Sequence, residues 1–270
     1  MIPIRDANPT RRMPILTLGL IAANVAIFLF WQPTFGGTEI DQQLFYFCNA
    51  EIPFEISEQQ NLADAGVEAR RALDEDFGDG AGAFLQPRLQ QECPDKSWLV
   101  SVFVAMFLHG SWLHIAGNML YLWVFGNNVE DRLGYVVFPL FYVAGGIAAA
   151  ALQFVFDPNS TVPSLGASGA IGAVLGAYAV LFPRARVTTL VIFFFITFIE
   201  VSALFVLGAW FVLQLFSGVG QLGVDVGGGG VAYWAHIGGF AFGAIIAWLF
   251  YRRPHVGTPE AYPAPRPDYF

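Results

Sequence analysis

The chain has 270 residues, of which 56% are hydrophobic and 13% charged, and its mean hydropathy is +0.55. Soluble domains are about one-quarter charged, so this composition, together with long uncharged apolar runs, indicates a polytopic membrane protein. The net charge of −8 arises mainly from acidic residues between Glu39 and Asp95. Lysine and arginine are scarce and form no basic stripe, which argues against nucleic-acid binding.

Six apolar segments predict an all-α bundle of six transmembrane helices. The first, residues 13–31, ends in large aromatic side chains rather than the small residues of a signal-peptide cleavage site. Residues 187–219 are too long for one upright span, and Glu200 divides them, so residues 187–199 are expected at the cytoplasmic interface. The predicted spans are 13–31, 98–125, 135–156, 168–182, 201–216 and 233–251.

The distribution of arginine predicts that both termini are cytoplasmic. The short loops 157–163 and 217–232 contain no lysine or arginine, as the positive-inside rule requires of outer loops. We therefore expect a cytoplasmic tail over 1–12, a membrane domain over 13–251 and a Pro-rich cytoplasmic tail over 252–270, in the plasma (inner) membrane. The arginines on the predicted inner side are Arg5, Arg11, Arg12, Arg132, Arg184, Arg186, Arg252 and Arg253.

An acidic insert, residues 32–98, separates the first two spans and is expected to be extracytoplasmic and partly ordered. A helix is expected near 63–74 and a loop at 78–82. Its two cysteines, Cys48 and Cys93, pair if the insert faces an oxidising compartment, and free thiols are the alternative. No Cys-x-x-Cys zinc pattern is present.

Four polar residues lie inside the predicted spans at similar depth near the outer side. His114 and Asn118 are four residues apart and share a helix face. Ser168 opens the fourth span, and His236 lies near the start of the sixth. Polar side chains inside a membrane usually face the bundle interior and mark function.

The glycines around Ser168 have two interpretations. Gly166 and Gly169 suit a strained turn that presents a nucleophile, or they are small residues for close helix packing. Two small-residue faces predict that the fourth and sixth spans pack together and bring His236 beside Ser168. These faces are Ser168, Gly172 and Gly176 on one helix, and Ala235, Gly239 and Gly243 on the other.

A serine beside a histidine is a nucleophile with its general base. His114, Asn118 and the backbone N–H of Ser168 are then candidate donors to an oxyanion. The sixth span has no carboxylate to orient His236, so a dyad is expected. Asp225 in the glycine-rich loop is the one nearby acid. No metal or cofactor is predicted.

Three motifs resemble the rhomboid family of intramembrane serine proteases. They are the run from His109 to Gly134, the sequence Gly166-Ala-Ser-Gly169, and the run from Ala235 to Gly243. The resemblance covers most of residues 98–251. It implies Ser168 as nucleophile, His236 as base, and His114, Asn118 and the Ser168 N–H as oxyanion donors. It also implies a site open to the outer face, with substrate entering near the fifth helix.

The sequence departs from this family pattern in three places. Some members carry an aromatic residue against the catalytic histidine where this chain has Gly172. Others have a Trp-Arg pair in the first outer loop, whereas Trp98 is followed here by Leu99. The insert is also longer than the resemblance leads us to expect.

The predicted function is therefore intramembrane serine endopeptidase, with transmembrane proteins as substrates and the lipid bilayer as surroundings. One alternative is a catalytically silent rhomboid-like protein that binds or chaperones membrane clients. Another is a six-span transporter, but the sequence shows no internal repeat and no charged pair in mid-membrane.

Overall fold

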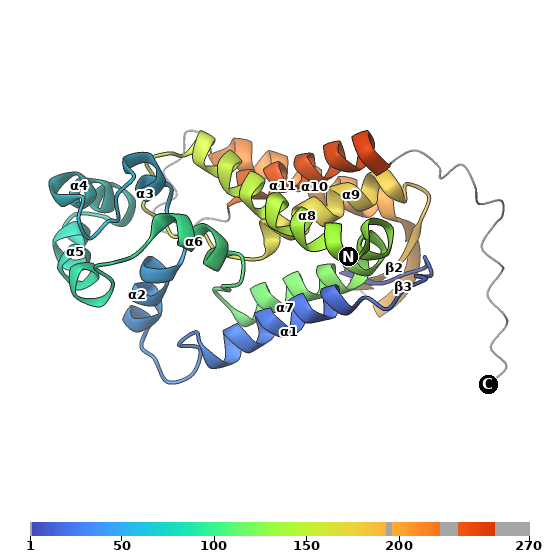
Figure 1. The fold of residues 1–270 in the computed structure, drawn as a ribbon, viewed down its shortest axis with the longest axis horizontal. Coiled ribbons are helices and arrows are strands. Elements are labelled where there is room, and N and C mark those ends of the chain that lie inside the picture. The colour runs from blue at the N-terminus through green and yellow to red at the C-terminus, as the bar shows by residue number, and fades with distance from the viewer. Residues whose placement is uncertain (1, 193–195, 222–231, 252–270) are drawn as a thin grey trace.

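The computed structural model describes residues 2–192, 196–221 and 232–251 (Figure 1). Asp225, most of the glycine-rich loop and the tail 252–270 lie outside these residues. The helices are α1 (Ile15–Phe30), α2 (Glu39–Asn49), α3 (Pro53–Glu58), α4 (Gly66–Phe77), α5 (Ala81–Glu92), α6 (Trp98–Ala105), α7 (Trp112–Tyr121), α8 (Asn127–Phe156), α9 (Ser168–Leu181), α10 (Ala203–Gln221) and α11 (Tyr233–Ile246). Short π-helical turns cover Leu122–Gly126 and Ala247–Tyr251.

Helix α9 is the centre of the bundle. Every residue from Gly169 to Tyr178 is buried, and α8 and α11 pack along it. Figure 1 shows the insert helices at one end of the molecule and the strands at the opposite end. The predicted segments 13–31, 168–182 and 233–251 correspond closely to α1, α9 and α11 with its π-helical turn.

Two helical stretches in the described part of the chain are long and apolar enough to cross a bilayer. They are Trp112–Phe156 and Tyr233–Tyr251, and three shorter apolar helices accompany them at Ile15–Phe30, Ser168–Leu181 and Ala203–Val219. The fold is therefore mostly helical, and the count of six spans remains a prediction.

The second predicted span, residues 98–125, is wrong as a single helix. The chain leaves α6 after Ala105 and begins α7 at Trp112. The side chain of Ser111 accepts the backbone N–H of His114 at 3.1 Å and so starts α7, because a serine oxygen satisfies an otherwise unpaired N–H at a helix start. The polar interval at His109, Gly110 and Ser111 lies at this break, but it is too short to divide the apolar run by hydropathy alone.

The expected polar turn at 126–134 is helical instead. The chain passes from α7 through the π-helical turn into α8, and only Gly134, with φ of +80°, interrupts the helical geometry. Glu130 accepts hydrogen bonds from the backbone N–H groups of Leu16 (3.0 Å) and Thr17 (2.7 Å). This carboxylate therefore caps the amino end of α1, where N–H groups lack partners.

A small antiparallel sheet was not predicted, and the all-α class is incomplete in this respect. Its strands are β1 (Ile2–Asp6), β2 (Arg186–Ile192) and β3 (Ile196–Ser202), in that order. Ile2 pairs with Leu190, so residues 1–12 are not simply a tail and 187–199 are not simply an interfacial segment. Asp6 accepts hydrogen bonds from the Tyr178 hydroxyl and Asn128, both at 2.6 Å, which ties β1 to the bundle.

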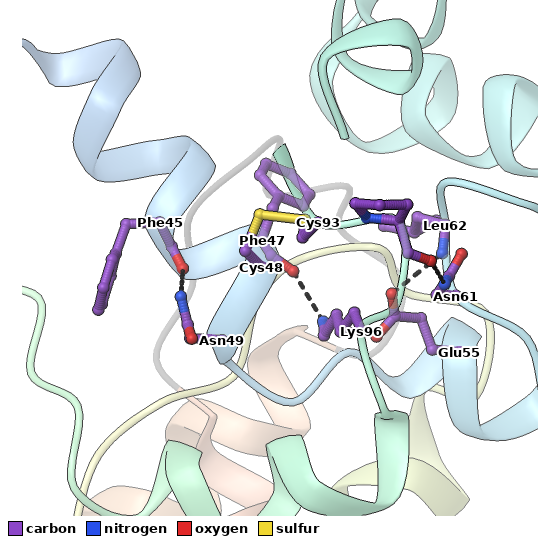
Figure 2. The surroundings of a disulfide bond; sticks show 10 residues. Phe45, Phe47, Cys48, Asn49, Glu55, Asn61, Leu62, Cys93 and Lys96 are labelled. Carbon is purple, nitrogen blue, oxygen red and sulfur yellow. Dashed lines mark hydrogen bonds and ion pairs between the residues drawn. A yellow bond between two sulfur atoms is a disulfide. The ribbon is translucent and has the colours of Figure 1, made fainter. Parts of the chain in front are cut away.

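The insert folds around a hydrophobic core of its own, so the expectation of partial order is wrong. A disulfide joins Cys48 to Cys93, and beside it Lys96 forms a buried ion pair with Glu55 at 2.6 Å (Figure 2). Lys96 also donates to the carbonyl of Phe47 at 2.7 Å. The core residues are Phe47, Ile52, Phe54, Leu62, Ala63, Ala69, Leu73, Leu85 and Leu89.

Glu51 in the insert makes stability depend on pH. Its side chain is 4% exposed, and burial raises the pKa of its carboxyl to about 7, against a partial opposing effect of the Lys96 charge. A pKa raised by folding means that the native state binds the proton more tightly than the unfolded chain does. Ionisation of Glu51 therefore lowers the free energy of unfolding. This loss is absent below about pH 4.5 and complete above about pH 7.

We expect Glu51→Gln to stabilise the protein at pH 8 by up to about 3 kcal/mol and to change little at pH 4, since each pKa unit corresponds to about 1.4 kcal/mol. Unfolding of the detergent-solubilised protein at both pH values measures this difference. The exposed Glu92 provides the control Glu92→Gln, which makes the same substitution where solvent surrounds the side chain. A Glu51→Gln variant less stable than the wild type at pH 8 would contradict the prediction.

Candidate active site

Ser168 is the first residue of α9, and backbone hydrogen bonds hold the segment that precedes it. The Gly166 N–H donates to the Ala105 carbonyl at 2.8 Å, and the Ser164 N–H donates to the Glu51 carbonyl at 2.7 Å. Gly166 has φ of +129°, which L side chains rarely adopt. A methyl group there would lie 2.8 Å from His114 Nε2 and 3.4 Å from Ser168 Oγ.

The two interpretations of the glycines therefore apply to different residues. Gly166 lies in a strained turn whose missing side chain leaves space between His114 and Ser168. Gly169 is a packing residue, because a methyl group there would lie 2.6 Å from the Cβ atom of Ala149 on α8.

His236 lies on α11 with its Nε2 atom 2.8 Å from Ser168 Oγ. Its Nδ1 atom has no hydrogen-bond partner among the described residues. The indole of Trp210 on α10 lies against the imidazole, with ring centroids 5.8 Å apart. At Gly172 a methyl group would already lie 3.0 Å from the His236 carbonyl oxygen. An aromatic residue does not fit at Gly172, and Trp210 supplies the ring against the histidine.

His114 and Asn118 lie on α7 and line the same cavity as Ser168. The Gly110 N–H donates to His114 Nδ1 at 3.4 Å, so the neutral ring carries its hydrogen on Nε2, which faces Gly166 and Ser168. Asn118 is 8% exposed, and its Nδ2 atom has no hydrogen-bond partner in the described structure. Two unused N–H donors therefore converge near the serine.

His109 lies behind His114 and does not line the cavity. Gln32 holds its backbone through two hydrogen bonds, at 3.0 Å to the N–H and 2.8 Å to the carbonyl. Its fully buried ring packs edge-on against His114, with centroids 5.1 Å apart. The two hydrogen bonds from Gln32 fix the loop between α6 and α7 at His109.

The cavity has a volume of about 710 Å³ and extends well beyond the four polar residues. Trp210 and Gln214 of α10 line it. Sequence reasoning missed both: an aromatic residue is ordinary in an apolar run, whereas the polar Gln214 was a usable signal that was not taken up. The insert also contributes lining residues, namely Gln43, Tyr46, Phe47 and Phe77. No group of three or more His, Cys, Asp or Glu side chains suited to a metal occurs within the described ranges.

Close packing of α9 on α11 sets the distance between Ser168 and His236. A methyl group at Gly239 would overlap the Gly169 carbonyl oxygen, and one at Gly243 would overlap the Ala173 carbonyl oxygen. Glycine at these positions lets the two backbones touch. The predicted contact between small-residue faces is thus present, with Gly169 and Ala173 as the residues of α9 that meet Gly239 and Gly243.

We expect Gly239→Ala to destabilise the protein by about 1–3 kcal/mol, the usual cost of overpacking a core. The added methyl group meets the backbone of α9, so α9 and α11 must separate and the contact between Ser168 and His236 must lengthen. Gly208→Ala is the matched control, because nothing lies within 4 Å of a methyl group at Gly208 on α10. Thermal unfolding in detergent compares the two, and equal melting temperatures would contradict the packing argument.

Comparison with known proteins identifies the family of this chain. A family model described as the Rhomboid domain matches residues 96–253, more than half of the chain. Rhomboid protein 1, mitochondrial, of Saccharomyces cerevisiae is 31% identical over 153 residues, covering 55% of this chain and 41% of the relative. RHOMBOID-like protein 1 of Arabidopsis thaliana is 30% identical over 170 residues, covering 61% of this chain and 39% of the relative.

A bacterial relative, Rhomboid protease GluP of Bacillus subtilis, is 47% identical over 70 residues, covering 26% of this chain and 13% of the relative. The matches to these three relatives span less than half of their length. Because the family model covers the helices that carry Ser168, His236, His114 and Asn118, the chain belongs to the rhomboid family.

Proposed function

We propose that this protein is a serine endopeptidase that cleaves transmembrane segments of other membrane proteins. The observation that carries the proposal is the 2.8 Å approach of His236 Nε2 to Ser168 Oγ. The name of the relative GluP as a rhomboid protease supports it. A hydroxyl in contact with an imidazole is a nucleophile with a general base.

The reaction follows serine-protease chemistry. Ser168 Oγ attacks the scissile carbonyl carbon while His236 Nε2 takes the hydroxyl proton. His236 then gives this proton to the leaving amine, and an acyl ester on Ser168 remains. Water, deprotonated by His236, hydrolyses the ester and restores the serine. The unpartnered Nδ1 of His236 agrees with a dyad in which packing on Trp210, rather than a carboxylate, orients the ring.

The oxyanion formed in each step needs donors placed where the charge develops. His114 and Asn118 lie on the same helix and line the cavity, and Asn118 Nδ2 has no hydrogen-bond partner among the described residues. Because Gly110 N–H donates to His114 Nδ1, the Nε2–H of His114 is free to donate to the oxyanion. The Ser168 backbone N–H at the start of α9 is the third donor in this proposal.

We further propose the six-span topology, with both termini cytoplasmic and the site near the outer face. The arginine distribution and the five apolar helical stretches support it, as does the separation of the insert and the sheet at opposite ends (Figure 1). Several relatives have mitochondrial names, which do not support a plasma-membrane location. The plasma (inner) membrane therefore remains a prediction from the sequence.

Labelling with a fluorophosphonate probe tests the activity. We expect the full chain in detergent to be labelled at Ser168, and Ser168→Ala to abolish labelling. Ser164→Ala is the matched control, since Ser164 lines the same cavity without contacting His236. A wild-type chain that resists labelling would contradict the protease proposal and favour a silent rhomboid-like protein that binds membrane clients.

A further inference from the structure

We propose that the outer face of the three-stranded sheet binds the membrane surface and prefers anionic phospholipid headgroups. This face carries apolar side chains towards the hairpin end of β2 and β3, and arginines towards the end that adjoins α9 and α10. The proposal concerns a lipid contact and is independent of the proposed peptidase function. The residues of the outer sheet face are Ile2, Arg5, Arg186, Thr188, Leu190, Phe198 and Glu200.

Strand pairing determines which side chains share this face. Side chains along a strand point alternately to opposite faces of a sheet, and directly paired residues point to the same face. Ile2 and Phe198 both pair with Leu190 and form an apolar row. The next row on the same face is polar and consists of Arg5, Thr188 and Glu200.

The opposite face of the sheet packs on the helical bundle. Val187 and Thr189 of β2 are fully buried, and Val187 belongs to the main hydrophobic core. Asp6, which pairs with Val187, accepts hydrogen bonds from the Tyr178 hydroxyl and from Asn128. The orientation of the sheet is therefore fixed, and the acidic residue of β1 points away from the outer sheet face.

The apolar row and the strand end beyond it are exposed. Phe198 is 63% exposed, Ile196 70% and Ile2 40%. Exposed apolar side chains that gather in one place mark a contact with a protein or a membrane. Exposed apolar surface resumes at Leu204 and Phe205, where β3 leads into the apolar helix α10. Apolar stretches on both sides of the polar row indicate a hairpin that lies along the membrane surface.

Arginine dominates the charge of the sheet and its flanks. Residues 1–12 and 183–202 contain five arginines and two acidic residues, whereas the whole chain has a net charge of −8. Arg186 pairs with Glu200 at 3.4 Å, but both side chains are more than half exposed. Exposed ion pairs contribute little, so the Arg186 guanidinium can exchange this carboxylate for a phosphate. The five arginines, all exposed, are Arg5, Arg11, Arg12, Arg184 and Arg186.

These two properties together identify the occupant as anionic lipid. The planar guanidinium matches the oxygens of a phosphate, and an arginine near an anionic membrane surface strengthens binding by a factor of about 5. Apolar side chains beside such a basic row enter the boundary between headgroups and acyl chains. Lipid fits this face better than a soluble acidic partner, because the apolar surface of the sheet continues onto an apolar helix of the bundle.

Spin labelling of the full chain in proteoliposomes tests the position of the outer sheet face. The two native cysteines are joined in a disulfide, so a label reacts at an introduced cysteine. Phe198→Cys reports on the apolar row, Phe205→Cys on α10 is the lipid reference, and Val67→Cys on the insert, 81% exposed, is the water reference. In vesicles of equal phosphatidylcholine and phosphatidylglycerol, the label on Phe198→Cys should resemble the lipid reference, colliding with oxygen more than with a water-soluble nickel chelate.

Thermal unfolding in detergent tests the preference for anionic headgroups. Dioctanoylphosphatidylglycerol should raise the melting temperature at lower concentration than dioctanoylphosphatidylcholine, because a ligand of the native state stabilises it. Arg5→Gln combined with Arg186→Gln should raise the phosphatidylglycerol concentration needed for the same increase about 25-fold, and lysine at both positions should restore most of the effect. Arg71→Gln combined with Arg88→Gln is the matched control, because both arginines are exposed on the insert, and should respond like the wild type.

The outcomes separate the possible occupants of the face. A label on Phe198→Cys that collides with the nickel chelate as often as the label on Val67→Cys places the face in water and overturns the proposal. Spin–spin broadening that disappears on dilution with unlabelled chain would place a second copy there and overturns it equally. Equal stabilisation by the two lipids, or an unchanged response of the Arg5 and Arg186 double glutamine variant, overturns the anionic preference. None of these measurements requires peptide-bond cleavage, so their results do not depend on the peptidase function.

Discussion

Replacing Ser168 by alanine is expected to lower the rate of the proposed peptide-bond cleavage at least about 10⁴-fold, because among the described residues Ser168 is the one whose hydroxyl forms a hydrogen bond with His236. His236→Ala should cause a similar loss, since a serine without its base is a poor nucleophile at neutral pH. The 2.8 Å contact predicts that the two residues act as one unit. The double variant should therefore lose little more than either single variant.

Cleavage of a single-span model protein in proteoliposomes measures these losses. Ser101→Ala is a suitable control, because Ser101 is a buried serine on α6 whose hydroxyl donates to the Trp98 carbonyl at 2.8 Å, away from the cavity lining. It should retain activity within a few-fold. Additive losses in the double variant would show that Ser168 and His236 act independently and would contradict the dyad.

The second large effect is expected at the oxyanion donors. His114→Ala and Asn118→Ala should each lower kcat by about 10²–10³-fold, which corresponds to about 3–4 kcal/mol. The charge on the oxyanion exists only in the transition state and the tetrahedral intermediate, so kcat should fall while KM stays nearly constant.

Gln214→Ala provides the matched control for these variants, because Gln214 also lines the cavity with a polar amide but comes from α10. Its effect on kcat should stay below about 5-fold. Losses for His114→Ala and Asn118→Ala that appear only in KM would instead indicate that these side chains bind substrate in its ground state.

The sequence predicted a helix well where a continuous apolar run within one segment marks it. Residues 168–182 were expected to be helical and form α9 from Ser168 to Leu181. The sheet was missed because its pairing is long-range: Ile2 pairs with Leu190, 188 positions further along a chain of 270 residues. Hydropathy also cannot show the break between α6 and α7, where Gln32 holds the backbone of His109 from another part of the sequence.

The candidate site likewise contains residues that the sequence predicted and a residue that only the structure reveals. Four of its polar residues stood out because a serine, two histidines and an asparagine are costly inside an apolar segment. Trp210 did not stand out, because an aromatic residue in an apolar helix needs no explanation. Its place against the His236 ring follows from how α10 packs on α11.

The sequence by itself determined the chemical groups of this protein and the small residues that let its helices approach. Only the tertiary structure sets the separation of Ser168 and His236, which are 68 positions apart in the sequence, at 2.8 Å. Only the tertiary structure shows that the insert, which contains the Cys48–Cys93 disulfide, lines the same cavity. The physical reason is that a contact between helices depends on every backbone atom at their interface. The missing side chain at Gly239, for example, matters only because the Gly169 carbonyl occupies that space.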